Sequence, residues 1–156
     1  MGEPRVGLGF DVHPTASGRP LWLGGVRFDG EDGLAGHSDG DVVCHAIADA
    51  LLGAAALGDL GTHFPDDDPD LQGIEGTSLL RRAVALVRER GFAPTSCDAT
   101  VLCERPAIAP RRDELRAALV EVLGVPMDRM SVKATRPEGL GLTGEGIGCL
   151  AIATIE

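Results

Sequence analysis

Aromatic side chains are scarce in this sequence, which has no tyrosine, one tryptophan and four phenylalanines among 156 residues. Surfaces that bind single-stranded nucleic acid usually stack the bases on several aromatic rings. An excess of basic residues is also lacking, because 14 lysines and arginines face 24 aspartates and glutamates, and the formal net charge is −10. Since a surface that follows a phosphate backbone needs a basic stripe, we expect no nucleic-acid partner.

Long hydrophobic runs are absent too. No stretch of the sequence approaches the roughly 20 consecutive apolar residues that a membrane-spanning helix needs. Residues 1–4 also lack the charged and then apolar pattern of a secretion signal. We therefore expect no membrane association and a cytoplasmic location.

The four cysteines do not form the closely spaced pairs that are typical of zinc knuckles and redox motifs. Each lies in an apolar segment, and free cysteine commonly behaves as a small buried hydrophobic residue. We therefore predict reduced thiols in the core at Cys44, Cys97, Cys103 and Cys149.

With 44% hydrophobic residues, a chain of this length can bury a real core, and it has room for one domain, residues 1–156. The expected elements are strands followed by helices that alternate with strands, which predicts an α+β fold: a single compact domain with a mixed β-sheet packed against helices. The expected strands cover residues 6–12, 97–103, 130–134 and 147–155, with a hairpin at 21–23 and 26–28. The expected helices cover residues 41–57, 77–90 and 110–123, and the expected loops cover residues 30–36 and 59–76.

All four histidines lie within the first 63 residues, beside acids and glycines. Asp11 and His13 are two residues apart on a predicted strand, so their side chains share one face of it. Asp41, His45 and Asp49 share one face of the first helix. Asp11, His13 and His45 together would give zinc three ligands and one open position. An Asp-x-His pair is also common as a simple hydrogen-bonded pair, so spacing alone leaves both interpretations open.

The start of that helix offers a second candidate feature. Ser38 or Asp39 can cap it, and its free N-terminal amides can hold an anion. The loop of residues 59–76, rich in Pro, Asp and Gly, is unusually long for a connection and is a candidate active-site loop. Its acidic run, residues 66–68, fits a solvated turn as well as a functional site.

Taken together, these motifs resemble the 2-C-methyl-D-erythritol 2,4-cyclodiphosphate synthase family, the cyclising enzymes of the non-mevalonate isoprenoid pathway. The similarity spans nearly the whole chain. It is carried by GLGFDVH at residues 7–13, HSDGD at 37–41 with His45, the helical run at 46–61, FPD at 64–66 and KAT at 133–135.

The resemblance implies a homotrimer with three active sites at subunit interfaces and with the sheets around a central axis. It also implies one zinc ion (Zn²⁺) per subunit, with Asp11, His13 and His45 as ligands. A second ion, magnesium (Mg²⁺) or manganese (Mn²⁺), would bind with the substrate near Glu138.

The reaction that the resemblance implies converts 4-diphosphocytidyl-2-C-methyl-D-erythritol 2-phosphate into the 2,4-cyclodiphosphate and CMP, with the 2-phosphate of the substrate as the nucleophile. The implied catalytic residues are His37, Ser38, Asp66 and Thr135. The implied contacts to the cytidine diphosphate substrate and its ions are Asp59, Gly61, Phe64, Cys103, Pro106, Ala107, Ile108, Ala134, Thr135, Arg136 and Glu138.

Several positions depart from the family pattern. Arg136 and Pro137 replace two threonines, and we expect Arg136 to contact phosphate in their place. Ala107 stands where a lysine is common, and Glu75-Gly76 stands where Asp-Ser is usual. The turn at residues 142–147 lacks an Arg-Gly pair, which implies weak or no binding of isoprenoid diphosphates on the trimer axis.

Two alternatives remain at this level. A zinc-dependent phosphohydrolase would use a similar set of ligands to attack phosphate with water. A trimeric metal-binding or nucleotide-binding scaffold without turnover would also fit the changed positions Ala107 and Arg136.

Overall fold

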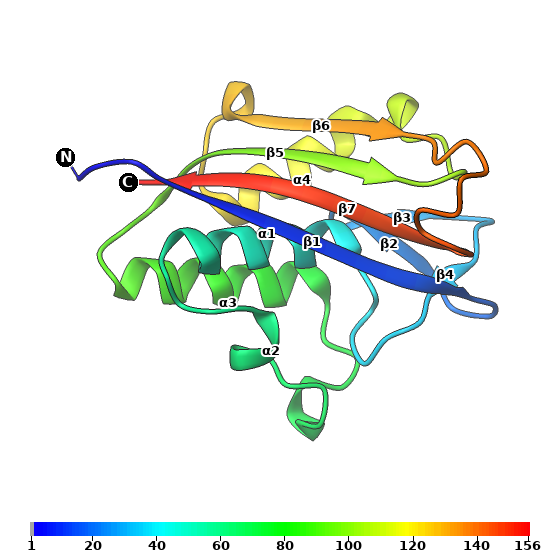
Figure 1. Ribbon diagram of the computed structural model, residues 1–156, viewed down its shortest axis with the longest axis horizontal. Helices are drawn as coiled ribbons and strands as arrows, with labels where there is room; N and C mark the ends of the chain where they lie inside the picture. The colour runs from blue at the N-terminus through cyan, green and yellow to red at the C-terminus, as the bar shows by residue number, and fades with distance from the viewer. Residues whose placement is uncertain (1) are drawn as a thin grey trace.

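A five-stranded sheet runs through the computed structural model, which describes residues 2–156 (Figure 1). The strand order is β4-β1-β7-β5-β6, and β5 and β6 are parallel while the other neighbours are antiparallel. The predicted mixed sheet is therefore confirmed. Its strands are β1 (Arg5–Ala16), β4 (Gly33–Leu34), β5 (Pro94–Leu102), β6 (Met130–Thr135) and β7 (Gly146–Ile155).

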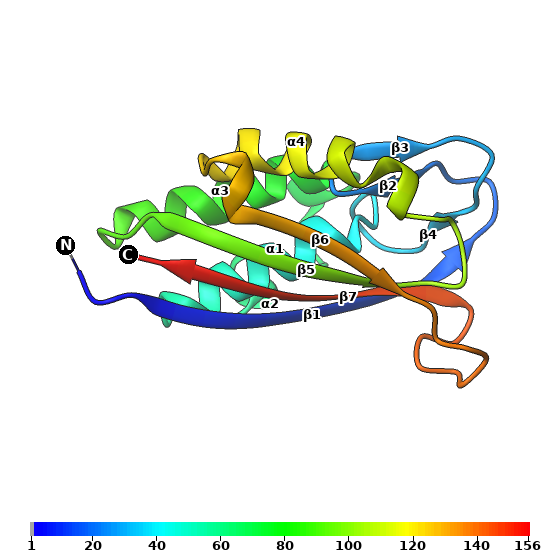
Figure 2. The ribbon, with the colours of Figure 1, turned by 90° about the horizontal axis from the view of Figure 1, so that it is seen from above.

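The longer helices all lie on one side of this sheet (Figure 2). Each turns an apolar side toward the core, as α3 does with Leu79, Leu80, Val84 and Val87. The helices are α1 (Val42–Ala54), the one-turn α2 (Leu60–His63), α3 (Gly76–Glu89) and α4 (Arg112–Leu123). Short 3₁₀ turns cover Pro69–Leu71, Ala109–Arg111 and Met127–Arg129.

The other side of the sheet carries exposed apolar side chains from alternate positions of β1 and β7. Leu8 pairs across the strands with Ile152, and Phe10 pairs with Leu150. Because side chains alternate along a strand, these residues form one continuous patch. The exposed fractions are 67% for Val6, 62% for Leu8, 52% for Phe10, 42% for Val12, 42% for Leu150 and 46% for Ile152.

Two glycines of β1 let α1 lie unusually close to the sheet. A Cβ atom at Gly7 would lie 1.9 Å from the carbonyl oxygen of Ala50, and one at Gly9 would lie 1.9 Å from that of Ala46. Any larger residue would therefore push the helix away. This close contact places the helix beside the strand that carries Asp11 and His13.

The predicted hairpin is confirmed as β2 (Leu21–Leu23) and β3 (Val26–Phe28). The predicted cap of the following helix is wrong, because Asp41 rather than Ser38 or Asp39 caps α1. The fully buried Asp41 carboxylate accepts from the amides of Gly24 and Gly25, at 2.8 Å each, and from those of Val43 and Cys44. The same carboxylate occupies the amides of Val43 and Cys44, so these two are not free to hold an anion.

Several element boundaries also differ from the prediction, as in β1, which runs to Ala16 rather than residue 12. The first helix ends at Ala54 rather than residue 57, because Ala56 and Gly58 take positive φ angles that turn the chain. The expected loop at 30–36 contains β4, which pairs with the end of β1. The expected loop at 59–76 contains α2 and a 3₁₀ turn.

All four cysteines are buried and free of disulfides, as predicted. Burial raises the pKa of the Cys97 thiol to about 12, so this thiol is unreactive. None of the helices within residues 2–156 combines the length and the apolar character needed to cross a membrane.

Candidate functional site

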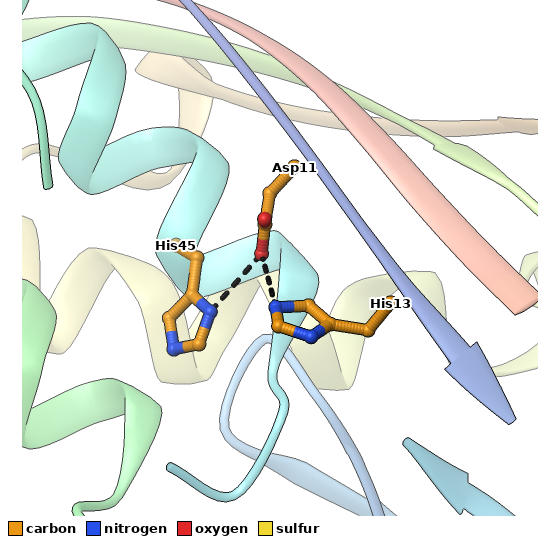
Figure 3. A group of neighbouring side chains, drawn as sticks. All are labelled: Asp11, His13 and His45. Carbon is orange, nitrogen blue, oxygen red and sulfur yellow. Dashed lines mark hydrogen bonds and ion pairs between the residues drawn. The ribbon is translucent and has the colours of Figure 1, made fainter. Parts of the chain in front are cut away.

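Asp11, His13 and His45 meet at the point where α1 packs against β1 (Figure 3). The Asp11 Oδ2 atom lies 3.0 Å from His13 Nε2 and 3.0 Å from His45 Nδ1. One ligand atom from each of the three residues lies within 4.8 Å of the other two. The structure therefore brings together the three residues that the sequence picked out as a metal site.

Each imidazole of this cluster is fixed by a second contact behind it. His13 Nδ1 lies 2.7 Å from the carbonyl oxygen of Ala35, and since a carbonyl only accepts, this nitrogen carries the proton. The hydrogen bond between Nε2 and Asp11 then needs a second proton on the ring, and a metal ion bound at Nε2 would take the place of that proton. His45 Nε2 lies 3.2 Å from Ser38 Oγ, which also accepts from the amide of Gly40 at 3.1 Å. Such outer contacts are usual for histidines that bind metals.

The electrostatics of the cluster favour a cation. Burial raises the pKa of Asp11, but hydrogen bonds with His13 and His45 outweigh it and bring this pKa down to about 2. The hydrogen bond to Asp11 raises the pKa of His13, although burial opposes this shift. An ionised carboxylate and two imidazoles form a donor set that zinc commonly takes. The residues present therefore fit a bound divalent metal ion.

A cleft of about 230 Å³ opens beside this cluster, and we call it the β1–α1 cleft. Five further predicted site residues line it: His37, Ser38, Gly61, Phe64 and Asp66. The His37 ring donates from Nε2 to the carbonyl oxygen of Asp68 at 3.0 Å, which anchors it to the 59–76 segment. Apolar side chains that the sequence did not single out also line the cleft, namely Leu60, Leu71, Ile74 and Leu79.

A second hollow of about 170 Å³, the β5–β6 groove, lies where these two parallel strands end. The carboxyl ends of parallel strands are a frequent place for ligands. The groove is lined by the predicted residues Cys103, Pro106, Ala107, Ile108, Ala134, Thr135 and Arg136, together with Ala109.

The β1–α1 cleft and the β5–β6 groove share no lining residue. Strands β7 and β5 separate β1 from β6, which corresponds to about 14 Å across the sheet. The predicted residues are thus divided into two groups within one chain. Each hollow is also smaller than the roughly 300–1,000 Å³ of an ordinary ligand pocket.

Four acids that the sequence analysis named, Asp41, Asp49, Asp59 and Glu138, lie outside both linings. Asp59 begins α2 and accepts from the amide and hydroxyl of Thr62, which lower its pKa. Glu138 is exposed and has a φ of 54° in the turn after β6. Asp49 accepts from the amide of Leu60, and Asp41 caps α1, so neither joins the metal cluster although both share a helix face with His45.

Two contributors to the site have no signal in the sequence. Ala35 acts through its backbone oxygen, so its side chain says nothing about the role. Arg19 donates to the carbonyl oxygens of Gly36 and Ser38 across a separation of 17 and 19 residues. Only the folded chain reveals these contacts.

Comparisons with known proteins agree with this geometry. The YgbB family model matches residues 4–156. The chain is 53% identical to 2-C-methyl-D-erythritol 2,4-cyclodiphosphate synthase of Salinibacter ruber over 154 residues, which covers 97% of this chain and 98% of that enzyme. It is also 53% identical to the bifunctional enzyme IspD/IspF of Anaeromyxobacter sp., where the match covers 95% of this chain and 38% of the longer enzyme.

Solved structures give the same picture. A 2C-methyl-D-erythritol-2,4-cyclodiphosphate synthase in a CDP-bound form superposes with a TM-score of 0.90 and 36% identity over 97% of this chain and all of that one. The IspF–CDP complex of Plasmodium falciparum superposes with a TM-score of 0.83 and 29% identity, covering 99% of this chain and 97% of that one.

Proposed function

Because this chain belongs to the YgbB family, we propose that its β1–α1 cleft and β5–β6 groove are two halves of a cyclodiphosphate synthase site. The reaction converts 4-diphosphocytidyl-2-C-methyl-D-erythritol 2-phosphate into 2-C-methyl-D-erythritol 2,4-cyclodiphosphate and CMP, in isoprenoid precursor biosynthesis. Identity of about 50% over nearly the full length of single-function synthases favours this activity over a phosphohydrolase. The convergence of Asp11, His13 and His45 is the observation that carries the proposal.

In this proposal Asp11, His13 and His45 hold one zinc ion per subunit. Glu138 would lie near the position of a second divalent ion, magnesium or manganese, that would arrive with the substrate. When bound, these ions would stabilise the negative charge on the phosphate oxygens. Ala35 and Ser38 keep the two imidazoles turned toward the ion.

The remaining residues of the β1–α1 cleft would bind and orient the substrate. The substrate supplies its own nucleophile, so the protein has only to fold the 2-phosphate back toward the diphosphate and hold the two in line. His37 and Ser38 contact the phosphates, and Asp66 fixes the erythritol hydroxyls. The apolar wall that includes Phe64 and Ile74 takes the methyl group and excludes water.

The β5–β6 groove receives the cytidine side of the substrate. Backbone and side-chain groups of Pro106, Ala107 and Ile108 would surround the base, with Cys103 behind them. Ala134, Thr135 and Arg136 would hold the diphosphate, while Asp59 and Gly61, from the side of the β1–α1 cleft, would contact the ribose. The CDP-bound forms of two relatives support a cytidine nucleotide as the ligand.

The complete site is proposed to form between copies of the chain, in a homotrimer with the sheets around a central axis. Two features support this: the two half-sites lie apart within one chain, and an apolar patch covers the open side of the sheet. We also propose that the protein is located in the cytoplasm.

Phosphorus NMR of the reaction with the diphosphocytidyl substrate tests the activity. We expect the cyclic diphosphate and CMP, and we expect their formation to stop in a chelator and to return with zinc and magnesium. A linear monophosphate product would instead establish the phosphohydrolase. Substrate binding without any product would establish the scaffold.

A further inference from the structure

One short segment, residues 35–38, supplies the outer contacts of both imidazoles in the metal cluster. Its Ala35 carbonyl oxygen accepts from His13, and its Ser38 hydroxyl meets His45. Gly36 lies against the His13 ring so closely that a Cβ atom there would be 3.2 Å from the imidazole. The position of this segment therefore sets the orientation of both rings.

The segment is attached to the rest of the chain at its two ends. The Ala35 amide donates to the Pro14 carbonyl oxygen at 2.8 Å, and the Asp39 amide donates to that of Ile74 at 3.1 Å. Between these points, the His37 carbonyl oxygen accepts from the amide of Gly73 at 2.7 Å. None of these three bonds involves the carbonyl oxygens of Gly36 and Ser38.

Arg19 holds both of these oxygens. Its Nη1 donates to the Gly36 carbonyl oxygen at 2.9 Å and its Nη2 to that of Ser38 at 2.6 Å. The planar guanidinium presents two donors at a fixed spacing, so one side chain spans two peptide groups. Arg19 is half-buried in the connection before β2, and it lies outside the lining of the β1–α1 cleft.

We propose that Arg19 is a positioning residue for the metal site, because it clamps residues 35–38 against His13 and His45. This inference rests on the proposed function, since it assumes that the cluster binds zinc. The residue touches neither the ion nor the substrate and acts only through this segment.

Zinc titration of metal-depleted protein against a competing chelator tests the clamp. In Arg19→Ala we expect about tenfold weaker zinc binding, the lower end of the loss that follows removal of an outer support. Arg19→Lys keeps the positive charge but loses the paired guanidinium donors, so its zinc affinity should lie between those of the wild type and Arg19→Ala. Arg27→Ala is the matched control, because Arg27 pairs at the surface with Asp29 and lies in neither site lining.

Hydrogen exchange of the metal-free protein gives a readout that is independent of zinc. In Arg19→Ala the amides of Gly40 and Gly73, which bond to Ser38 and His37, should exchange faster than in the wild type. The amides of Gly24 and Gly25, which bond to Asp41, should not change.

Unchanged zinc affinity and unchanged exchange at Gly40 in Arg19→Ala would overturn the role of Arg19. Failure of the wild-type protein to bind zinc would instead overturn the proposed metal site, so the two claims fail in different ways.

Discussion

The carboxylate of Asp11 stays ionised down to about pH 2, because its hydrogen bonds with two imidazoles outweigh the effect of burial. The pKa of His13 shifts upward instead, because the same hydrogen bond raises it above the ordinary value of 6.5. At neutral pH the cluster is therefore poised to exchange a proton on imidazole for a metal ion.

This raised pKa predicts the pH dependence of metal binding. Below the pKa of His13 the ring is protonated, and zinc has to displace that proton. Affinity should thus fall as the pH is lowered through this pKa, by up to about tenfold per pH unit for one proton, and should level off above it. Chelator competition between about pH 5.5 and 8.5 measures this, on either side of an ordinary histidine pKa. Affinity independent of pH would contradict the assignment of His13 as a ligand.

Arg136 is one of the positions at which the family resemblance predicts a departure from the usual pattern. If its guanidinium contacts the diphosphate, Arg136→Ala should weaken CDP binding by about tenfold, the value of one hydrogen bond to a charged group. Zinc affinity should not change, because Arg136 lies in the β5–β6 groove and away from the metal cluster. Arg129→Ala, just before the opposite end of β6, is the control in the same calorimetric titration. CDP affinity that is equal in both variants would show that Arg136 has no such contact.

At the scale of the elements, the strong periodic segments could be predicted from the sequence and the local connections could not. The spacing of Asp11 and His13 on a strand and of His45 on a helix made them candidates for one site, because those periodicities are regular. Spacing also left a simple hydrogen-bonded pair open, and the family resemblance selected the metal site. The cap was missed because Ser, Asp, Gly and Asp occur together before α1, and only the fold shows that Asp41 also binds the hairpin amides. The short β4 and α2 are held by tertiary contacts, as when Asp49 accepts from the first amide of α2.

The site shows the same division. Side-chain chemistry indicated the metal cluster, whereas the roles of the Ala35 carbonyl oxygen and of Arg19 depend on backbone atoms that carry no residue-specific signal. The split between the β1–α1 cleft and the β5–β6 groove was also invisible in the sequence, because motif spacing does not say which residues face the same hollow.

The close contact between β1 and α1 gives a prediction about an element pair. Gly9→Ala places a Cβ atom against the carbonyl oxygen of Ala46, so the free energy of unfolding should fall by about 2–3 kcal/mol, as in other overpacked cores. The helix would also move His45 away from Asp11, and zinc binding should weaken. Urea unfolding measures the first effect.

Gly53→Ala is the matched control for that experiment. Gly53 lies in α1, and a Cβ atom at this position would have no neighbour within 4 Å, so alanine should be neutral or stabilise the helix by up to about 1 kcal/mol. Equal stability of the two alanine variants would contradict the role of Gly9 in helix packing.

At the scale of the whole molecule, the apolar patch on β1 and β7 is the surface that the proposed trimer would bury. Leu8→Glu places a charge in its centre, so we expect this variant to dissociate into folded monomers and to lose most of its synthase activity. Met127→Glu, on a 3₁₀ turn away from the patch, should keep the assembly. Sedimentation velocity distinguishes the two, and a Leu8→Glu protein with the mass of the wild-type assembly would exclude the patch from the interface.

In the proposed trimer, the β1–α1 cleft of one copy and the β5–β6 groove of another form one active site. Two variants test it: His45→Ala disables the cleft, and Ala134→Trp fills the groove. Each alone should be inactive, because every site then contains a damaged half. Co-expression in equal amounts gives mixed trimers, in which random assembly joins an intact cleft to an intact groove at about a quarter of the interfaces.

Activity of the co-expressed pair in the CMP-release assay is therefore the most direct measurement. If each site is shared between two copies, two variants that are inactive alone should together recover about a quarter of wild-type activity. A mixture no more active than the separate variants, with mixed trimers shown to be present, would contradict it.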